Sequence, residues 1–148
     1  TANLDLFSKA KICISKRGWI DFHAPRFHHG PRWTMIPDEI LVYLDTTAWE
    51  RVRLLEDEDI VAPGIRAFWT GVHHKSSMAI CVDTSKGRVV FTDSVFKYDN
   101  VEKNISLGIT RSLDECEVAY ERIRREADIL VPAYDPEVVK RHPGGVIA

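Results

Sequence analysis

The chain has 148 residues, of which 45% are hydrophobic and 28% charged, and its formal net charge is −2 at pH 7. This length and composition predict a single soluble globular domain over residues 1–148, with enough apolar side chains to bury a core. The near-neutral charge argues against nucleic-acid binding, and no apolar run approaches the roughly 20 residues that cross a bilayer, so we expect a cytoplasmic protein without a signal peptide or a membrane partner.

The cysteines give no indication of a metal or redox motif. Cys13, Cys81 and Cys116 are odd in number and lack the spacing of either kind of site. Two of them lie in apolar runs that are typical of strands. We therefore expect buried, reduced thiols in a reducing compartment.

The first segments of the chain are short. Lys11–Ser15 has the alternation of a strand, and Lys16–Phe22 is long enough for a turn or two of helix. Over His23–Trp33 the composition changes to histidine, proline, arginine, glycine and aromatic residues, which is typical of a loop. Because the adjacent side chains of His28 and His29 diverge in either helix or strand, we expect them to face a substrate or another subunit rather than a metal.

A helix and a strand follow this loop. Proline and two acidic residues lead an apolar stripe over about Pro37–Thr46, which predicts a helix. We expect Glu50–Leu55 to be a strand, Glu56–Asp59 to be a solvated charged turn, and Ile60–Gly64 to lead into the centre of the chain.

The centre of the chain predicts an antiparallel sheet. Three runs are rich in β-branched and aromatic residues, and a Thr84–Gly87 turn joins the last two. The runs are Ile65–Trp69, Met78–Val82 and Arg88–Thr92. Runs of this composition around a short turn indicate neighbouring antiparallel strands.

Polar residues interrupt this sheet at two strand ends. Thr70–Ser77 follows one strand and Asp93 follows another, so we expect imidazole and carboxylate groups at the same rim. These ligands suit zinc, iron and manganese, and a rigid sheet end fixes their geometry. A lone histidine or aspartate at a strand end is more often a structural hydrogen-bonding group, and Ser76 and Ser77 are expected only to hydrogen-bond the turn.

The last third of the chain predicts one long helix. Residues 94–110 are irregular, and Ser112–Ala127 begins with a capping-box pattern. Its apolar face consists of Leu113, Cys116, Ala119, Tyr120 and Ile123. We expect a strand at Ile129–Pro132 and a short helix at Glu137–Arg141. Strands followed by helices on an antiparallel or mixed sheet indicate an α/β or α+β layered fold.

Three motifs resemble the second half of the metallo-β-lactamase fold, especially the branch of the N-acyl homoserine lactonases. They are WTGVHH, VVFTDSVFKYDN and ADILVPAYDPEV, in the order in which that branch carries Thr-Pro-Gly-His, Gly-Asp and Pro-Gly-His-Asp-Pro. Asn3–Phe7 also resembles the segment that follows the family's His-x-His-x-Asp-His motif. The resemblance implies half of an αββα sandwich and extends over nearly the whole chain.

The resemblance also implies roles for individual residues. His73 matches a metal-ligating histidine, Asp93 matches the carboxylate that bridges two metals, and Tyr134 stands in place of the final histidine. Phe96 stands where the lactonases tend to carry a tyrosine that polarises the substrate carbonyl. The family implies one or two divalent ions, zinc first, with iron or manganese as alternatives. Tyrosine is a poor neutral ligand, which puts the second metal in doubt.

Substrate contacts are expected around this rim. His74 is adjacent to His73 and points elsewhere in an extended chain, so it is a candidate for substrate contact. Trp33 and Phe96 are core residues by default, but both lie in loops near the rim, where they could wall an aromatic pocket together with His28 and His29.

The family's His-x-His-x-Asp-His motif is absent from the sequence. An isolated half of the sandwich would expose an apolar sheet face, which soluble proteins avoid. We therefore expect a split enzyme, a hetero-oligomer in which a separate N-terminal chain brings the missing ligands and completes the fold.

The function implied by the resemblance is hydrolysis by a metal-bound hydroxide, with Asp93 and Tyr134 as the candidate catalytic residues. The aromatic loops and the two-subunit arrangement resemble a split nitroaromatic ether O-demethylase of the dinitroanisole type. The alternatives are a lactone hydrolase of the N-acyl homoserine lactone type and a degenerate, non-catalytic scaffold subunit.

Overall fold

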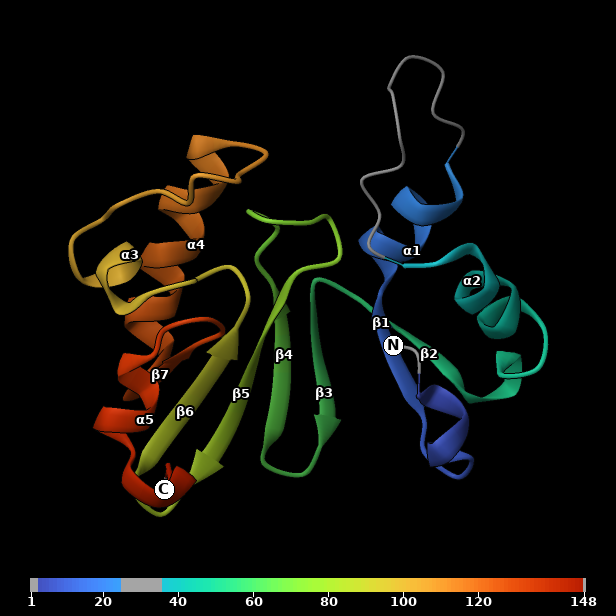
Figure 1. The fold of residues 1–148 in the computed structure, drawn as a ribbon, viewed down its shortest axis with the longest axis horizontal. Coiled ribbons are helices and arrows are strands. Elements are labelled where there is room, and N and C mark those ends of the chain that lie inside the picture. The colour runs from blue at the N-terminus through green and yellow to red at the C-terminus, as the bar shows by residue number, and fades with distance from the viewer. Residues whose placement is uncertain (1–2, 25–35, 148) are drawn as a thin grey trace.

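A computed structural model of the chain describes residues 3–24 and 36–147 (Figure 1). Within them, strands form a two-stranded sheet and a five-stranded sheet, with helices around both. The mixed α and β composition agrees with the fold class expected from the sequence.

The five-stranded sheet has the order β3-β4-β5-β6-β7. Its strands are β3 (Glu58–Ala62), β4 (Ile65–Trp69), β5 (Met78–Thr84), β6 (Gly87–Thr92) and β7 (Ile129–Pro132). The first four pair antiparallel, and β7 runs parallel to β6. The three predicted central strands and the strand at Ile129–Pro132 are thus confirmed. Thr84 Oγ1 closes the predicted turn by donating to the Gly87 carbonyl oxygen at 2.6 Å.

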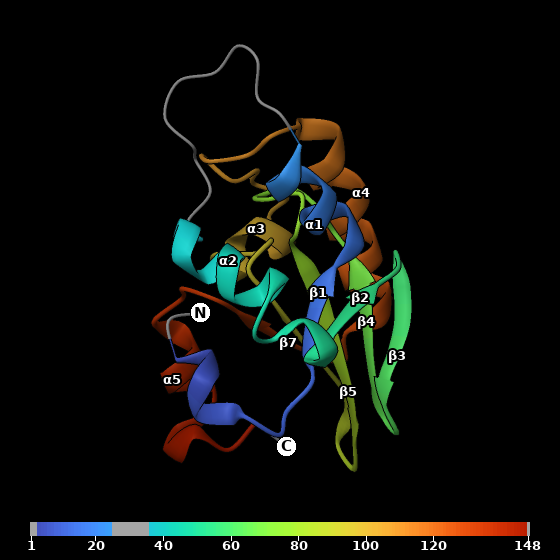
Figure 2. The same cartoon turned by 90° about the vertical axis from the view of Figure 1, so that its right-hand side faces the viewer.

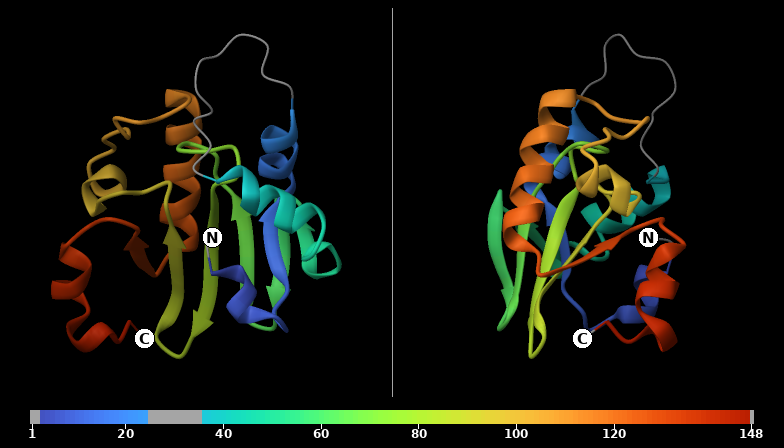
Figure 3. Two further views of the ribbon diagram at one scale, coloured as in Figure 1. Left: turned by 45° about the vertical axis from the view of Figure 1, so that its right-hand side comes forward. Right: turned by 90° about the vertical axis from the view of Figure 1, so that its left-hand side faces the viewer.

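Helix α4 (Leu113–Glu126) covers one face of this sheet (Figure 3). Ser112 caps it, because its hydroxyl accepts a hydrogen bond from the Glu115 N–H at 3.3 Å. The buried core between α4 and the sheet includes Phe68, Val72, Ala79, Cys81, Val90, Cys116, Ala119, Tyr120 and Ile123. Leu113 was expected on the same apolar face, but as the first residue of the helix it is 65% exposed and lies outside the buried core.

The N-terminal part forms a smaller unit on the other side of the molecule (Figures 1 and 2). Strand β1 (Ile12–Ser15) pairs parallel with β2 (Val52–Leu55), and these two strands pair with no other strand among the described residues. The helices of this part are α1 (Lys16–His23), α2 (Asp38–Asp45) and the 3₁₀ turns η1 (Leu4–Phe7) and η2 (Trp49–Arg51).

Close packing joins α1 to the five-stranded sheet. A Cβ added to Gly18 would lie 2.3 Å from the Ser76 Cβ, so only glycine permits this approach. Arg17 forms two hydrogen bonds with the Asp57 carboxylate at 2.6 and 2.5 Å, and its guanidinium lies 4.2 Å from the centre of the Trp69 ring.

Three sequence predictions need correction here. Glu58 and Asp59 belong to β3 rather than to a turn, because Arg66 and Arg122 pair with Glu58 and Arg53 pairs with Asp59. The stretch expected to be irregular contains α3 (Tyr98–Glu102), and the expected strand at Glu50–Leu55 starts two residues later, after η2.

The thiols also differ in part from expectation. Cys81 and Cys116 are buried and unpaired, as predicted, whereas Cys13 is exposed on β1. Burial raises the pKa of the Cys81 thiol, which keeps it protonated.

The remaining elements are the short helix α5 (Glu137–Arg141), as predicted, and the 3₁₀ turn η3 (Pro143–Gly145). Among residues 3–24 and 36–147, no helix has the length and hydropathy that crossing a membrane requires.

A histidine between α1 and α2 makes the N-terminal unit sensitive to pH. The Trp19 carbonyl oxygen lies 2.8 Å from His23 Nδ1 and the Asp45 carboxylate lies 3.0 Å from Nε2, and these contacts raise the pKa of His23 above its ordinary value of 6.5. A raised pKa means that the protonated form stabilises the fold. This stabilisation is complete below pH 6.5 and is lost as the pH rises through the raised value.

We therefore predict that Asp45→Asn lowers the free energy of unfolding more in acid than in base. The loss is at most about 1 kcal/mol at mildly acidic pH, because both side chains are partly exposed. Urea denaturation across the range measures it, with Asp5→Asn as a charge-matched control on an exposed turn. An equal loss at acidic and alkaline pH would contradict the assignment.

Candidate functional site

Three strands of the large sheet end at the same rim. Because β5 is antiparallel to both β4 and β6, and β7 is parallel to β6, the carboxyl ends of β4, β6 and β7 point the same way (Figure 1). His73 follows β4, Asp93 follows β6 and Tyr134 follows β7. The topology thus delivers all three candidate residues to one edge.

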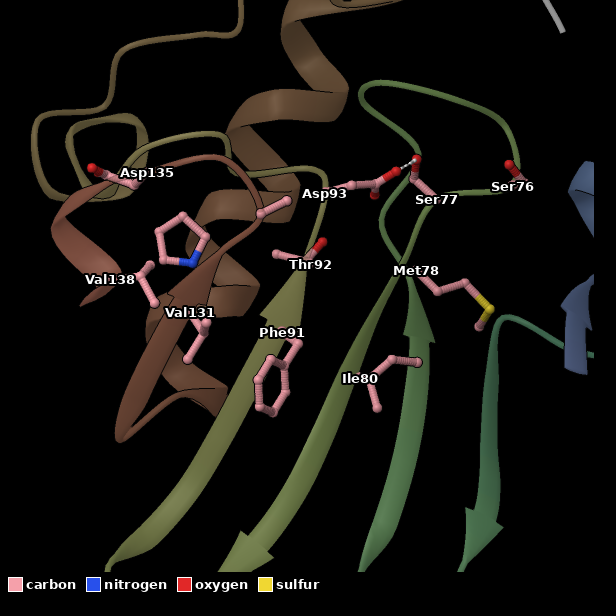
Figure 4. Close-up of a pocket in the computed structure, with 12 residues that line it drawn as sticks. Ser76, Ser77, Met78, Ile80, Phe91, Thr92, Asp93, Val131, Asp135 and Val138 are labelled. Atoms are coloured by element: carbon pink, nitrogen blue, oxygen red, sulfur yellow. Dashed lines mark hydrogen bonds between the residues drawn. The ribbon is translucent and has the colours of Figure 1, made fainter. Parts of the chain in front are cut away.

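Ser77 links the loop after β4 to the end of β6. Its hydroxyl donates to Asp93 Oδ2 at 3.1 Å and accepts a hydrogen bond from the His74 N–H at 3.1 Å (Figure 4). Ser77 is only 3% exposed, so this contact is shielded from water. The serine therefore fixes the Asp93 carboxylate against the loop that carries His73 and His74.

A row of rings lies beside this link. The His73 and Phe96 rings meet edge-on with their centroids 5.0 Å apart, and the Phe96 and Tyr134 rings do the same at 4.8 Å. His73 Nδ1 also lies 3.3 Å from the Ile109 carbonyl oxygen. Phe96 thus stands between the other two rings and contacts both, while Tyr134 is 62% exposed.

The His74 ring packs beside the ring of its neighbour His73. Its ring centroid is 4.0 Å from that of His73. Burial lowers the pKa of His74, the nearby His73 lowers it further, and the Asp93 carboxylate opposes both effects. His74 therefore favours a neutral imidazole, which can both donate and accept a hydrogen bond.

An open pocket of about 600 Å³ lies below Asp93 on the sheet face that α4 does not cover (Figure 4). Ile80, Phe91 and Val131 are paired across three neighbouring strands, so their side chains share this face. Asp93 follows Phe91 by two positions and lies above them. Met78 and Val138 complete an apolar floor beneath the Asp93 carboxylate.

Asp135 also borders this pocket, but its carboxylate is engaged elsewhere. One oxygen accepts a hydrogen bond from the Glu137 N–H at 2.9 Å, and the other accepts one from the Tyr98 N–H at 2.9 Å. These two bonds lower the pKa of Asp135. Asp135 therefore joins α3 and α5 to the end of β7 and is no free acid.

The residues in this part of the chain do not complete a metal site by themselves. Across residues 3–24 and 36–147, no three or more histidine, cysteine, aspartate or glutamate side chains are grouped to hold an ion. A catalytic zinc normally has three protein ligands. His73 and Asp93 could supply two, and a metal here requires further ligands from outside the described residues.

The structure describes only some of the residues that were predicted to contact a substrate. His28, His29 and Trp33 lie outside the described residues. The rings of His74 and Phe96 lie beside the His73 ring at the rim, and their contact with a substrate stays a prediction. The hydrogen bond from Ser77 to Asp93 was not predictable from the sequence, because no local pattern indicates a contact across 16 positions.

The solved structures that resemble this chain have metallo-β-lactamase-type folds. No protein-family model matches the chain, and no curated protein does. An N-acyl homoserine lactone hydrolase, solved with N-hexanoyl-L-homoserine at its catalytic metal centre, is 15% identical with a TM-score of 0.65, over 93% of this chain and 52% of that one. A Thermotoga maritima protein assigned as a metallo-β-lactamase is 21% identical with a TM-score of 0.59, over 90% and 60%.

A Staphylococcus aureus protein assigned as a metal-dependent hydrolase is 14% identical with a TM-score of 0.66, over 88% of this chain and 46% of that chain. The chain thus spans about half the length of these solved structures. At such identities the likeness shows the fold alone, and this fold is half of the metallo-β-lactamase fold.

Proposed function

We propose that this chain is one part of a metal-dependent hydrolase, with its active site at the rim formed by His73, Asp93 and their neighbours. The observation that carries the proposal is the convergence of His73 and Asp93 at one rim, where they follow different strands and the buried Ser77 ties Asp93 to the backbone of His74, the neighbour of His73. Imidazole and carboxylate groups are ligands that suit divalent metals such as zinc. The hydrolases of the same fold support the choice of a metal.

The chain's own residues would position ligands and substrate. A bound divalent ion would supply a water that is acidic enough to attack near neutral pH. Asp93 offers two carboxylate oxygens fixed by Ser77, and His73 offers Nε2, since its Nδ1 faces the Ile109 carbonyl oxygen. Neutral His74 could exchange a proton with a substrate oxygen.

The missing ligands are proposed to come from a polypeptide with the complementary half of the fold, which carries the His-x-His-x-Asp-His motif. Two features support such a partner. Strands β1 and β2 form an isolated parallel pair, whereas parallel strands normally belong to larger sheets buried on both faces. The apolar floor at Ile80 and Phe91 is only half-buried, so a packed partner would shield it.

As the substrate class we propose a nitroaromatic methyl ether, cleaved by water to a nitrophenol and methanol. The supporting observation is the row of aromatic rings at the rim, in which Phe96 contacts both His73 and Tyr134. A lactone substrate is the second candidate, because the structural relatives include an enzyme with the product of lactone opening at its metal.

A non-catalytic scaffold is the alternative of a different class. It is favoured if the completed fold also lacks a third ligand near His73 and Asp93. Metal content therefore separates the enzyme from the scaffold before any substrate is tested.

We predict that Asp93→Asn lowers the metal content of the completed assembly by at least one ion per chain and removes nearly all turnover. The amide loses the charge that offsets the cation and offers only one oxygen. Elemental analysis of the purified assembly measures the loss, with Asp99→Asn, a half-exposed carboxylate that pairs with Lys103, as the control. Full metal content in the Asp93 variant would show that Asp93 is not a ligand.

The substrate class can be decided with a small panel. We expect turnover of dinitroanisole-type methyl ethers, followed by the absorbance of the released nitrophenolate, and little turnover of N-acyl homoserine lactones. A Phe96→Ala change should raise KM for the ether at least tenfold, because it removes the ring that joins His73 to Tyr134. Turnover of lactones alone would remove the ether proposal.

The partner is tested by expressing the chain with and without the complementary half. Alone, the chain should self-associate through its open strands and bind zinc weakly. Together, the two should sediment as one complex with an interface of at least about 2,000 Å². A monomeric, fully metal-loaded and active 148-residue chain would refute the need for a partner.

A further inference from the structure

The backbone directly before His73 has an uncommon conformation. Gly71 and Val72 both have positive φ, at 62° and 63°. The His73 N–H donates to the Gly71 carbonyl oxygen at 2.8 Å, which closes a three-residue turn centred on Val72. A γ-turn with positive φ is the rare, strained form, and positive φ is most costly for a β-branched residue such as valine. Such a turn persists only where surrounding contacts hold it.

The contacts that hold Val72 come from the start of α4. The Val72 N–H donates to Glu115 Oε2 at 3.1 Å. The Val72 carbonyl oxygen accepts from the Arg111 N–H at 2.9 Å and from Thr110 Oγ1 at 3.3 Å. The side chain of Val72 is fully buried in the core. Both polar groups of the strained residue are therefore tied to one segment, Thr110–Glu115, about 40 positions along the chain.

Glu115 is itself fixed in place. Its other oxygen accepts a hydrogen bond from Lys75 Nζ at 2.8 Å, so the carboxylate joins both sides of the loop that carries His73. It also lies against the Gly71 backbone, since a Cβ at Gly71 would come within 2.7 Å of Glu115 Oε2. Glutamate at this helical position often bonds back to the capping residue's N–H, but here the carboxylate bonds Val72 instead.

We propose that Glu115 is a positioning residue for His73. By holding the Val72 N–H, it maintains the strained turn that places the His73 ring against the edge of Phe96 at the rim. The importance of this placement for turnover rests on the proposed function, whereas the placement itself does not. Glu115 contacts neither His73 nor the pocket below Asp93, and it has no part in the chemical step.

The direct test observes the His73 ring. The chain, in the form in which it is soluble, alone or with its complementary half, is labelled with ¹³C-histidine, and His73→Gln identifies the signal among its six histidines. In Glu115→Ala the His73 ring signals should shift by more than their line width and lose their nuclear Overhauser contacts to Phe96. In Glu115→Gln they should persist, because the amide oxygen can still accept from the Val72 N–H.

A second variant covers the case in which Glu115→Ala does not fold. Glu115→Asp keeps the charge near Lys75 but is one methylene too short to reach Val72, so it should move the His73 signals as the alanine variant does. Unchanged contacts between His73 and Phe96 in both variants would overturn the proposal and leave Glu115 with a structural role alone.

A coupling measurement tests the strain itself. Glycine adopts positive φ without the cost that valine incurs, so the turn in Val72→Gly depends less on Glu115. Glu115→Ala should therefore lower the melting temperature by less in the Val72→Gly background than in the wild-type chain. Equal losses in both backgrounds would show that Glu115 does not hold the turn. Because neither readout involves metal or turnover, this proposal and the proposed function can fail independently.

Discussion

The pairing of β5 with both of its neighbours is the constraint on which the rest of the structure depends. It makes β4 and β6 run in the same direction, and β7 follows β6 in parallel. Three chain segments that are far apart in sequence therefore leave the sheet at one rim, where a rigid base holds their side chains. The same pairing divides the sheet into a face buried under α4 and a face that forms the apolar floor below Asp93.

Hydrogen bonds between buried polar groups hold the loops at this rim in place. Ser94, which is fully buried, hydrogen-bonds Thr70 at 2.7 Å and the Gly71 carbonyl oxygen at 3.3 Å, and Ser77 ties the same loop to Asp93. A buried hydroxyl without a partner is costly, so these contacts specify one loop conformation. The strained turn at Val72 fits this picture, because its cost is balanced by bonds from outside the loop.

Much of the fold could be predicted from the sequence because its signals are local. Runs of β-branched and aromatic residues marked β4 to β6, and the Ser112 cap marked the start of α4. The predictions failed where contacts with residues distant in the sequence determine the secondary structure. Helix α3 begins where the Tyr98 N–H donates to the Asp135 carboxylate. Strand β3 begins at Glu58, whose carboxylate pairs with Arg66 and Arg122. For the same reason the rim position of Asp93 was predictable from its strand, while the contacts from Ser77 and Glu115 were not.

The central claim is that His73 and Asp93 belong to one metal site in a completed hydrolase fold. Anomalous diffraction at the zinc absorption edge, from crystals of the chain with its complementary half, tests it most directly. The account predicts a peak within about 2.0–2.2 Å of both a His73 ring nitrogen and an Asp93 carboxylate oxygen. A fully assembled fold whose only anomalous peaks lie away from these two residues would contradict it.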